Sequence, residues 1–389
     1  MNTYLLIDHI YVQNANAIAG FTWGFPAITH FLGFTHNLDR KLNATYNFPE
    51  VGIKGCAVIS HEQHVHTYRT NYDFEFTQSR NPPYLASHKK EATPPVIEEG
   101  RMNMMVSLLI GIEGNIGNRK EDFIAWVRKS AFLQRLAGGT ILDIRNIELI
   151  DSSETYYIRR KLLPGFVLMD RSDYLEAYHY LRLEDDPNSE LLHSWMHFSA
   201  LKYRARPKNE LISRYLKNLD QKDLFNKEVN LHSMWNSHLS HPYGGDSNEL
   251  NDIKAHFSKL EKTKLNKKLI EQWEQYITPN DKTDAEWDML SKPNKGYLVP
   301  LMTGYKAISD VLPNAEVANT RDNDTDVCFV ESVHTVGEWI GVHRLRTEQE
   351  LNASLWHYHF EKDWYLCKQK ITEEVGLVST ETDFTNEFE

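Results

Sequence analysis

Short runs of apolar residues, many of them alternating with polar ones, recur through the first 150 residues of the chain. This pattern is typical of strands and predicts five of them, over residues 4–12, 51–59, 64–76, 101–112 and 140–150. Apolar residues recur every three or four positions over residues 28–42 and 119–137, which predicts two helices. The pair Gly138–Gly139 is expected to cap the second helix.

The resulting order, β-α-β-β-loop-β-α-β, predicts an α+β fold of the ferredoxin-like type. The common RNA-recognition module has the same architecture. Residues 77–95 contain four prolines and several polar residues, which excludes a central strand or helix and predicts a projecting loop or ribbon. A further strand is expected within residues 155–169, so the first domain should span residues 1–172.

The character of the sequence changes after residue 172. Residues 173–294 are polar and Lys-rich, and apolar residues stand at helical spacing from Phe257 to Trp273, which predicts a mainly helical insertion. Residues 295–367 return to a mixed α/β pattern and should pack on the first domain. Residues 371–389 carry six acidic groups and no Lys or Arg, so residues 368–389 are expected to form an acidic, mobile tail.

The composition of the chain excludes only a few classes of protein. The chain has 389 residues, 41% of them hydrophobic, which is enough for two or three domains with their own cores. With a mean hydropathy of −0.53 and no run of 18 apolar residues, no transmembrane helix is expected. The N-terminus has neither a cationic segment nor a small-residue cleavage site, so a cytoplasmic protein is expected rather than a secreted one. The net charge of −11 argues against nucleic-acid binding unless basic residues are clustered.

Sequence motifs exclude the simplest enzymatic and metal-binding interpretations. The three cysteines form no CxxC pair, and ordinary thiols in a reducing compartment are expected. Neither the phosphate-loop motif, nor GxGxxG, nor GxSxG occurs. The stretch HEQHVH has the wrong spacing for HExxH and lacks Cys or acidic partners, so neither a metal site nor a cofactor is predicted there, nor at WHYHF near the C-terminus.

The loop QNANAIAGFTWGF, residues 13–25, concentrates amides, aromatic rings and glycines. Asn14 and Asn16 offer donors and acceptors for base edges, Trp23 offers a stacking face, and Gly24 permits close approach of the backbone. The structural alternative is an ordinary strand-to-helix connection.

Four basic segments are candidates for phosphate contact, and each also has a structural alternative as a helix end or a solvated surface. They are Arg135 with Gly138 and Gly139; Arg80 and Asn81 in the proline-marked projection; Arg159–Arg160–Lys161; and Lys202, Arg204, Arg206 and Lys208 in the insertion.

Seven segments in collinear order resemble one family. They are QNANAI…TWGFP (13–26), VIEEGR (96–101), RLAGGTIL (135–142), RRKLLPGF (159–166), GYLVPLMTGY (296–305), RD…FVESVHTVGEW (321–339) and LWHYH (355–359). The chain is similar to the Csy-type backbone-capping subunit, the second Csy protein of the Cas-five group, of type I-F CRISPR surveillance complexes. The resemblance covers most of residues 4–170 and 295–360 and is weakest in the helical insertion.

The resemblance implies a non-catalytic subunit with a ferredoxin-like domain and a protruding β-hairpin thumb, here residues 72–97. Such a subunit binds the 5′ handle of the guide RNA, pairs with the large subunit and abuts the terminal copy of the backbone subunit. Target DNA is then reached through the complex, by base pairing with the guide. The glycine-rich loop of the superfamily corresponds to Gly138–Gly139.

Together, the residue types and the resemblance give one candidate RNA-binding set. It comprises Asn14, Asn16, Trp23, Gly24, Arg69, Arg80, Asn81, Arg101, Arg135, Gly138, Gly139, Arg159, Arg160, Lys161 and Arg321. Catalytic residues, metal ligands and cofactors are not expected.

Two alternative functions remain at the level of the sequence. The first is a metal-independent endoribonuclease that processes repeat RNA, with His64, His66 and Tyr68 as general acid–base candidates. The second is a protein-only scaffold whose basic segments are merely solvated.

Overall fold

The computed structural model describes residues 3–20, 22–44, 48, 50–70, 73–77, 79–80, 96–97, 100–222, 230–240, 248–320, 322 and 324–369. The chain divides into two compact units, Met1–Ala200 with Lys292–Glu389, and Leu201–Ser291. The mainly helical insertion was expected over residues 173–294. Helices α4 (Ser172–Asp185) and α5 (Leu191–Ser199) belong to the first unit, so the second unit begins only at Leu201. The expected acidic tail lies outside the described residues from position 370 onward.

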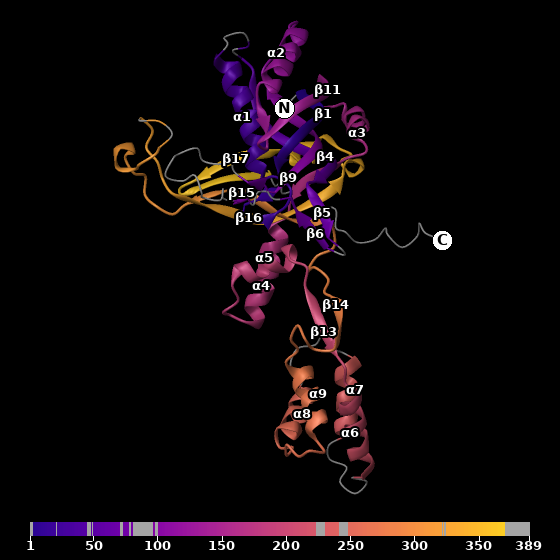
Figure 1. The fold of residues 1–389 in the computed structure, drawn as a ribbon. Coiled ribbons are helices and arrows are strands. Elements are labelled where there is room, and N and C mark those ends of the chain that lie inside the picture. The colour runs from indigo at the N-terminus through magenta and orange to yellow at the C-terminus, as the bar shows by residue number, and fades with distance from the viewer. Residues whose placement is uncertain are drawn as a thin grey trace. The chain divides into compact units, whose positions relative to one another are not determined.

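An antiparallel sheet dominates the first unit (Figure 1). Among the described residues it has ten strands, in the order β10 (Arg135–Leu136), β11 (Gly139–Asp151), β1 (Thr3–Asn16), β9 (Arg101–Glu113), β4 (Gly52–Val65), β12 (Phe166–Asp170), β16 (Val330–Gly341), β15 (Leu298–Ala307), β18 (Trp364–Gln369) and β17 (Trp356–Glu361). Trp356 of β17 also pairs with Cys56 of β4. The last strand in this order therefore contacts β4, which lies in the middle of the order.

Short two-stranded sheets complete the β-structure of the described residues. They pair β2 (Ile18–Ala19) with β3 (Thr22–Trp23), β5 (Thr67–Thr70) with β6 (Asp73–Phe76), β7 (Ser79–Arg80) with β8 (Val96–Ile97), and β13 (Tyr203–Pro207) with β14 (Ala285–Met289).

Helices of the first unit cover both faces of the sheet. They are α1 (Ile28–Ala44), α2 (Lys120–Phe132), α3 (Thr155–Leu162), α4 (Ser172–Asp185), α5 (Leu191–Ser199) and α10 (Glu348–Ala353), with short 3-10 turns at Asn314–Glu316 and Val342–Arg344. Alternate residues of β1 face opposite ways, as a pleated strand requires. Leu5 and Ile7 pack in the cluster that contains α1 and α2, whereas Tyr4 and Leu6 pack in the cluster that contains α3 and α10.

The second unit is a small helical bundle built on the β13–β14 ribbon. Its helices are α6 (Glu210–Lys222), α7 (Leu231–Ser240), α8 (Asn248–Ser258) and α9 (Lys267–Ile277). Aromatic rings fill its core: Trp235 is fully buried, and Phe257 stacks on Trp273 at 4.1 Å between ring centroids. Full burial of side chains of this size contributes about 1.5–3 kcal/mol each, which accounts for a stable core in a short segment.

Most of the expected elements of the first 150 residues are confirmed, and two are wrong in detail. The strand expected over 64–76 is the end of β4 followed by the separate β5–β6 hairpin. The helix expected over 119–137 ends at Phe132. The further strand expected within residues 155–169 is β12, and the helix α3, which was not expected, precedes it. In the second unit, the helical spacing from Phe257 to Trp273 is interrupted between α8 and α9.

None of the helices in the described part of the chain combines the length and apolar character needed to span a bilayer.

Candidate RNA interface

Two β-bulges distort β1, and each contains a residue in the left-handed region of backbone space. His9 has φ 49° and Asn14 has φ 57°. The register of β1 shifts against β9 at both places. Such bulges redirect side chains and are over-represented next to functional sites. Each bulge lies beside a cluster of polar side chains, one around Asn16 and the other around Asp8.

The first cluster surrounds Asn16, at the end of β1. The side-chain oxygen of Asn16 accepts a hydrogen bond from Arg101 at 2.5 Å, and its amide nitrogen lies 3.3 Å from Nε2 of His30. Burial lowers the pKa of His30, and the neutral ring can donate from Nδ1 to Ala27 O while Nε2 accepts from Asn16. Both ends of the Asn16 amide are therefore engaged within the chain, so this side chain fixes the loop rather than offering itself to a base.

The turn between β10 and β11 closes over Asn16. The backbone N–H of Asn16 donates to Ala137 O at 2.8 Å. Ala137 and Gly138 form a two-residue turn with φ 50° and 77°, the left-handed conformation that tight hairpin turns favour. The expectation that Gly138–Gly139 caps a helix is wrong, because residues 135–140 form a hairpin.

Exposed groups surround this turn. Arg135 is exposed and donates to Gly138 O at 3.3 Å, and Asn14 is exposed while its backbone N–H is held by Asn103 Oδ1 at 3.0 Å. We name Asn14, Asn16, Arg101, Arg135, Gly138 and Gly139 the bulge site. These six members of the candidate set come together from three separate parts of the sequence.

An aromatic platform is connected to the bulge site through the backbone. Trp23 stacks on Phe76 with ring centroids 3.8 Å apart, and it leaves no room for a side chain at Gly100. The carbonyl of Gly100 accepts a hydrogen bond from the backbone N–H of Ala17. The carbonyl of Ala17 in turn accepts one from the backbone N–H of Gly24. With 41% of Trp23 exposed, part of the ring stays available for stacking.

The remaining candidate residues lie elsewhere. Arg69, on β5, places its guanidinium 5.7 Å from the ring of Phe74. The backbone of Arg80 pairs in β7, while Asn81 and Arg321 lie outside the described residues. Arg159, Arg160 and Lys161 are on α3, which packs in the cluster that contains Tyr4 and Leu6.

Acidic partners already engage part of the basic sequence. Lys161 lies 3.3 Å from Glu148. In the second unit, Arg206 contacts Glu286 at 2.8 Å, and Lys208 pairs with Asp284. The basic segment formed by Lys202, Arg204, Arg206 and Lys208 is therefore partly neutralised, by Glu286 on β14 and by Asp284 just before that strand.

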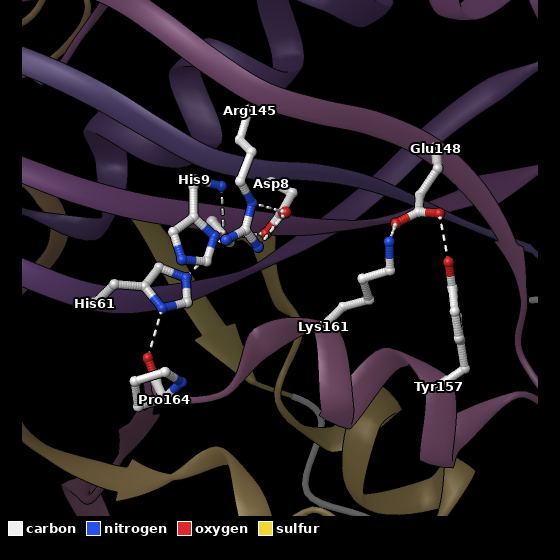
Figure 2. A network of polar contacts seen from close by, with 9 residues as sticks. Asp8, His9, His61, Arg145, Glu148, Tyr157, Lys161 and Pro164 are labelled. Atoms are coloured by element: carbon white, nitrogen blue, oxygen red, sulfur yellow. Dashed lines mark hydrogen bonds and ion pairs between the residues drawn. The ribbon is translucent and has the colours of Figure 1, made fainter.

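The second cluster, missed by the sequence analysis, lies at the other bulge (Figure 2). Asp8 has 1% of its side chain exposed, and one of its oxygens, Oδ2, accepts from Nη2 and Nε of Arg145 at 2.6 and 2.8 Å. Its other oxygen lies 2.7 Å from Nδ1 of His9. His9 in turn stacks on His61 with ring centroids 3.8 Å apart. The signal in the sequence was a charged pair, Asp8–His9, inside an otherwise apolar strand.

His61 ties this cluster to the loop after α3. Its Nδ1 donates to Pro164 O at 2.8 Å, and its Nε2 lies 2.7 Å from the hydroxyl of Ser107. Although ligand atoms of Asp8, His9 and His61 lie within 4.8 Å of one another, a guanidinium and a hydroxyl already occupy the carboxylate. The arrangement is that of an internally satisfied polar network, which holds the α3 loop on the sheet.

His61 and three other partly buried histidines predict an acid-sensitive fold. Burial is the main cause that lowers the pKa of His61, and of His30, His256 and His334. The unfolded chain, with histidine pKa values near about 6.5, therefore binds more protons than the folded chain, and stability should fall as pH drops below that value. Each such group contributes at most about 1.4 kcal/mol per pH unit.

The measurement is the midpoint of urea unfolding between pH 7.5 and 5.5, compared with His61→Gln. Burial raises the pKa of Asp170, which acts in the opposite direction, so the difference between the two proteins isolates His61. If the urea midpoint changed equally with pH in both proteins, His61 would not be a cause of the acid sensitivity.

Comparison with known proteins agrees with the resemblance seen in the sequence. The family model described as CRISPR-associated protein (Cas_Csy2) matches residues 5–235 and 247–367. The chain is also 26% identical over 379 residues to CRISPR-associated protein Csy2 of Pseudomonas aeruginosa (strain UCBPP-PA14), with 92% of each chain covered. The fold and the matched residues thus define a CRISPR-associated protein. The chain belongs to the Csy2 family.

Proposed function

We propose that this chain is a non-catalytic subunit of a type I-F CRISPR surveillance complex, and that it binds the 5′ handle of the guide RNA. It pairs with the large subunit and abuts the terminal backbone subunit, and it acts in the cytoplasm. Foreign DNA is recognised by base pairing with the guide, while protein holds shape and phosphates. The match to the Csy2 family supports the CRISPR role.

The element order supports a ferredoxin-like domain. Strands β1, β4, β9 and β11 are connected as β1-α1-β4-β9-α2-β11 and stand in the order β11-β1-β9-β4. The order β-α-β-β-α-β is that of the ferredoxin-like motif, and its sheet is a common RNA-binding scaffold. The wider ten-stranded sheet of the described residues adds β10 at the β11 edge, and β12 and β15–β18 at the β4 edge.

The pairing of β7 with β8 supports a hairpin thumb at residues 72–97. Ser79 lies opposite Ile97 and Arg80 opposite Val96, so two antiparallel segments flank residues 81–95, which lie outside the described residues. We propose the limits 1–172, 173–294 and 295–367 for the functional parts of the chain, and the compact unit Leu201–Ser291 lies within the second of them.

The observation that carries the RNA-binding proposal is the bulge site. Exposed Arg135 and exposed Asn14 flank a glycine turn that is joined to β1 by the hydrogen bond from Asn16 N to Ala137 O. The ring of Trp23 packs at Gly100, the residue before Arg101 of the bulge site. Unpaired ribonucleotides are recognised by amides, rings and a few cations, without acid–base chemistry. The fold brings these groups together through contacts such as that between Asn16 and Arg101, which are 85 positions apart. Their chemistry suits single-stranded RNA.

We expect Arg135→Glu to weaken binding of handle RNA by about tenfold, which corresponds to about 1.4 kcal/mol, the scale of one charge-assisted hydrogen bond. Arg80→Glu and Arg159→Glu are predicted to act in the same direction. The measurement is RNA affinity of the full chain with its large-subunit partner, as a function of salt, because phosphate contacts weaken with added salt.

Lys264→Glu is the matched control, since Lys264 is an exposed cation of the second unit and no part of the candidate set. Unchanged affinity in all three variants would reject the assigned site, even in a protein of this family.

Repeat-RNA cleavage separates this proposal from the endoribonuclease. The hydroxyl of Tyr68 donates to Glu75 at 2.7 Å, and His66 lies 3.2 Å from Asn103, so two of the three acid–base candidates have local partners. Specific cleavage by the purified chain that disappears in His66→Ala would overturn the non-catalytic assignment.

A further inference from the structure

The end of the β15–β16 hairpin exposes large apolar side chains on one face. Ile308 and Phe329 are each 57% exposed and are joined by a backbone hydrogen bond of 2.9 Å that continues the ladder beyond the strands. Trp364 is 37% exposed and lies opposite Lys306 in the register, with the ammonium 4.9 Å from its ring. Residues directly opposite one another share a face, and alternate residues along a strand return to it. Ile308, Phe329 and Trp364 therefore form one apolar face.

The connecting loop is held in place by its own hydrogen bonds. Leu312 and Val327 form a β-bridge across it. The side-chain amide of Asn314 donates to Asp322 O and Thr325 O at 2.8 and 2.9 Å. Figure 1 shows this loop in orange beyond the labelled ends of β15 and β16. Because the loop is internally bonded, the apolar groups at its base, with Val311 at 69% exposure, are presented on a fixed surface.

The same loop is strongly acidic. Exposed carboxylates are contributed by Asp310, Glu316, Asp322, Asp324 and Asp326. Between residues 306 and 331 the sequence has six acids and two bases, Lys306 and Arg321. Lys306 lies opposite Glu331, and the RNA-binding candidate Arg321 lies outside the described residues. The segment is net negative, and a negative field of this kind attracts a basic protein surface.

We propose that this acidic hairpin surface, formed by Ile308, Val311, Phe329 and Trp364 with the carboxylates of Asp310, Glu316 and Asp324, docks a protein partner. The complementary partner surface is an apolar depression with Lys and Arg at its rim. Contiguous exposed apolar groups mark such interfaces, and aromatic anchors within a polar rim are their usual composition. The inference rests on the proposed function, because subunits that hold guide RNA carry the basic surfaces that this charge pattern complements.

A thiol placed on this face reports on it. Cys328 is exposed, but it is adjacent to Phe329 and therefore points to the opposite face, whereas Cys56 and Cys367 are buried. In a Lys306→Cys, Cys328→Ser protein, maleimide should modify position 306 first, because Lys306 is exposed and lies opposite Trp364. In the assembled complex we expect its labelling to slow by at least about tenfold, as full burial in a protein interface excludes the reagent.

The comparison has three arms: the chain alone, the chain with guide RNA alone, and the complete assembly. Protection in the complete assembly alone supports the proposal. Protection by RNA alone would assign the surface to nucleic acid instead, and unchanged labelling in the assembly would also overturn the proposal. A Leu265→Cys, Cys328→Ser protein measures reagent access at a residue that is 93% exposed, and equal protection there would show that the effect is not specific.

Charge reversal gives an independent test. The variant combines three substitutions, Asp310→Lys, Glu316→Lys and Asp324→Lys. Asp322 and Asp326 are left unchanged, because their side chains accept hydrogen bonds from the loop backbone. The triple variant should reduce recovery with the partner subunits about tenfold near 0.1 M salt, and less at about 0.5 M, where the field is screened.

A matched triple of exposed acids in the second unit, Asp252→Lys, Glu261→Lys and Asp281→Lys, should leave recovery unchanged. Equal recovery of both triple variants rejects the docking surface. The RNA affinity of the chain is measured separately, so that result would leave the bulge site standing.

Discussion

Asp8→Ala is expected to lower the free energy of unfolding by about 3–5 kcal/mol, the range found when one partner of a buried charged pair is removed. Asp8 is almost fully buried. It accepts from Arg145 on β11, from His9 on β1 and from Ser107 on β9. Its loss leaves polar groups of three strands without their shared acceptor, and the desolvation of these groups is then uncompensated. Urea unfolding at pH 7.5 measures the change.

Asp143→Ala is the control, because Asp143 is an exposed acid on β11, the strand that carries Arg145. Its expected effect is within about 0.5 kcal/mol, as for other exposed substitutions. A double-mutant cycle with Arg145→Ala should give a coupling energy above about 1 kcal/mol. Additive effects, or a loss at Asp8 no larger than at Asp143, would show that the network does not stabilise the fold.

The elements of the first domain were largely predictable from periodicity. The spacing of Ile28, Phe31, Leu32 and Leu38 faces one side of a helix, and all four are buried in α1. The same signal failed after Phe132, because Leu133 and Leu136 keep helical spacing although they belong to a turn and to β10. Apolar spacing alone cannot show where a chain leaves a helix to pair with another strand.

The helix α3 illustrates a second limit. Its residues include two tyrosines and a basic run, a composition that is compatible with a strand. Burial of Ile158 and Leu162 on the sheet selects the helix, since residues four apart share a helical face. That tertiary contact overrides the local preference, and it cannot be seen in the segment itself.

The candidate site was predictable only by residue type. The amides, glycines and arginines of the bulge site are of the kinds that contact RNA, and the sequence singled them out. Its geometry depends on cross-strand contacts such as Arg101–Asn16 and on left-handed residues within bulges. The role of Asn16 as a fixed support, and the whole Asp8 network, therefore emerged only from the fold.

Gly139→Ala should destabilise the chain by about 2–3 kcal/mol and also reduce binding of handle RNA, because it displaces the β10–β11 turn. A Cβ atom at Gly139 would lie 2.7 Å from Gln13 O and 2.8 Å from Ala15 N. These are backbone atoms of β1 that cannot rotate away, so the hairpin must separate from the bulge that holds Asn14. The contact between Asn16 N and Ala137 O would be lost with it.

The same substitution at Gly33 provides the matched control. Gly33 lies within α1, and a Cβ there would meet nothing within 4 Å. Gly33→Ala should therefore stabilise the chain by up to about 1 kcal/mol through the lower entropy of the unfolded state, with RNA affinity unchanged. Opposite signs for one chemical change would show that the turn requires glycine because β1 lies against it. Equal stability of the two variants would mean that the turn can move freely, and the bulge site would then lose its fixed geometry.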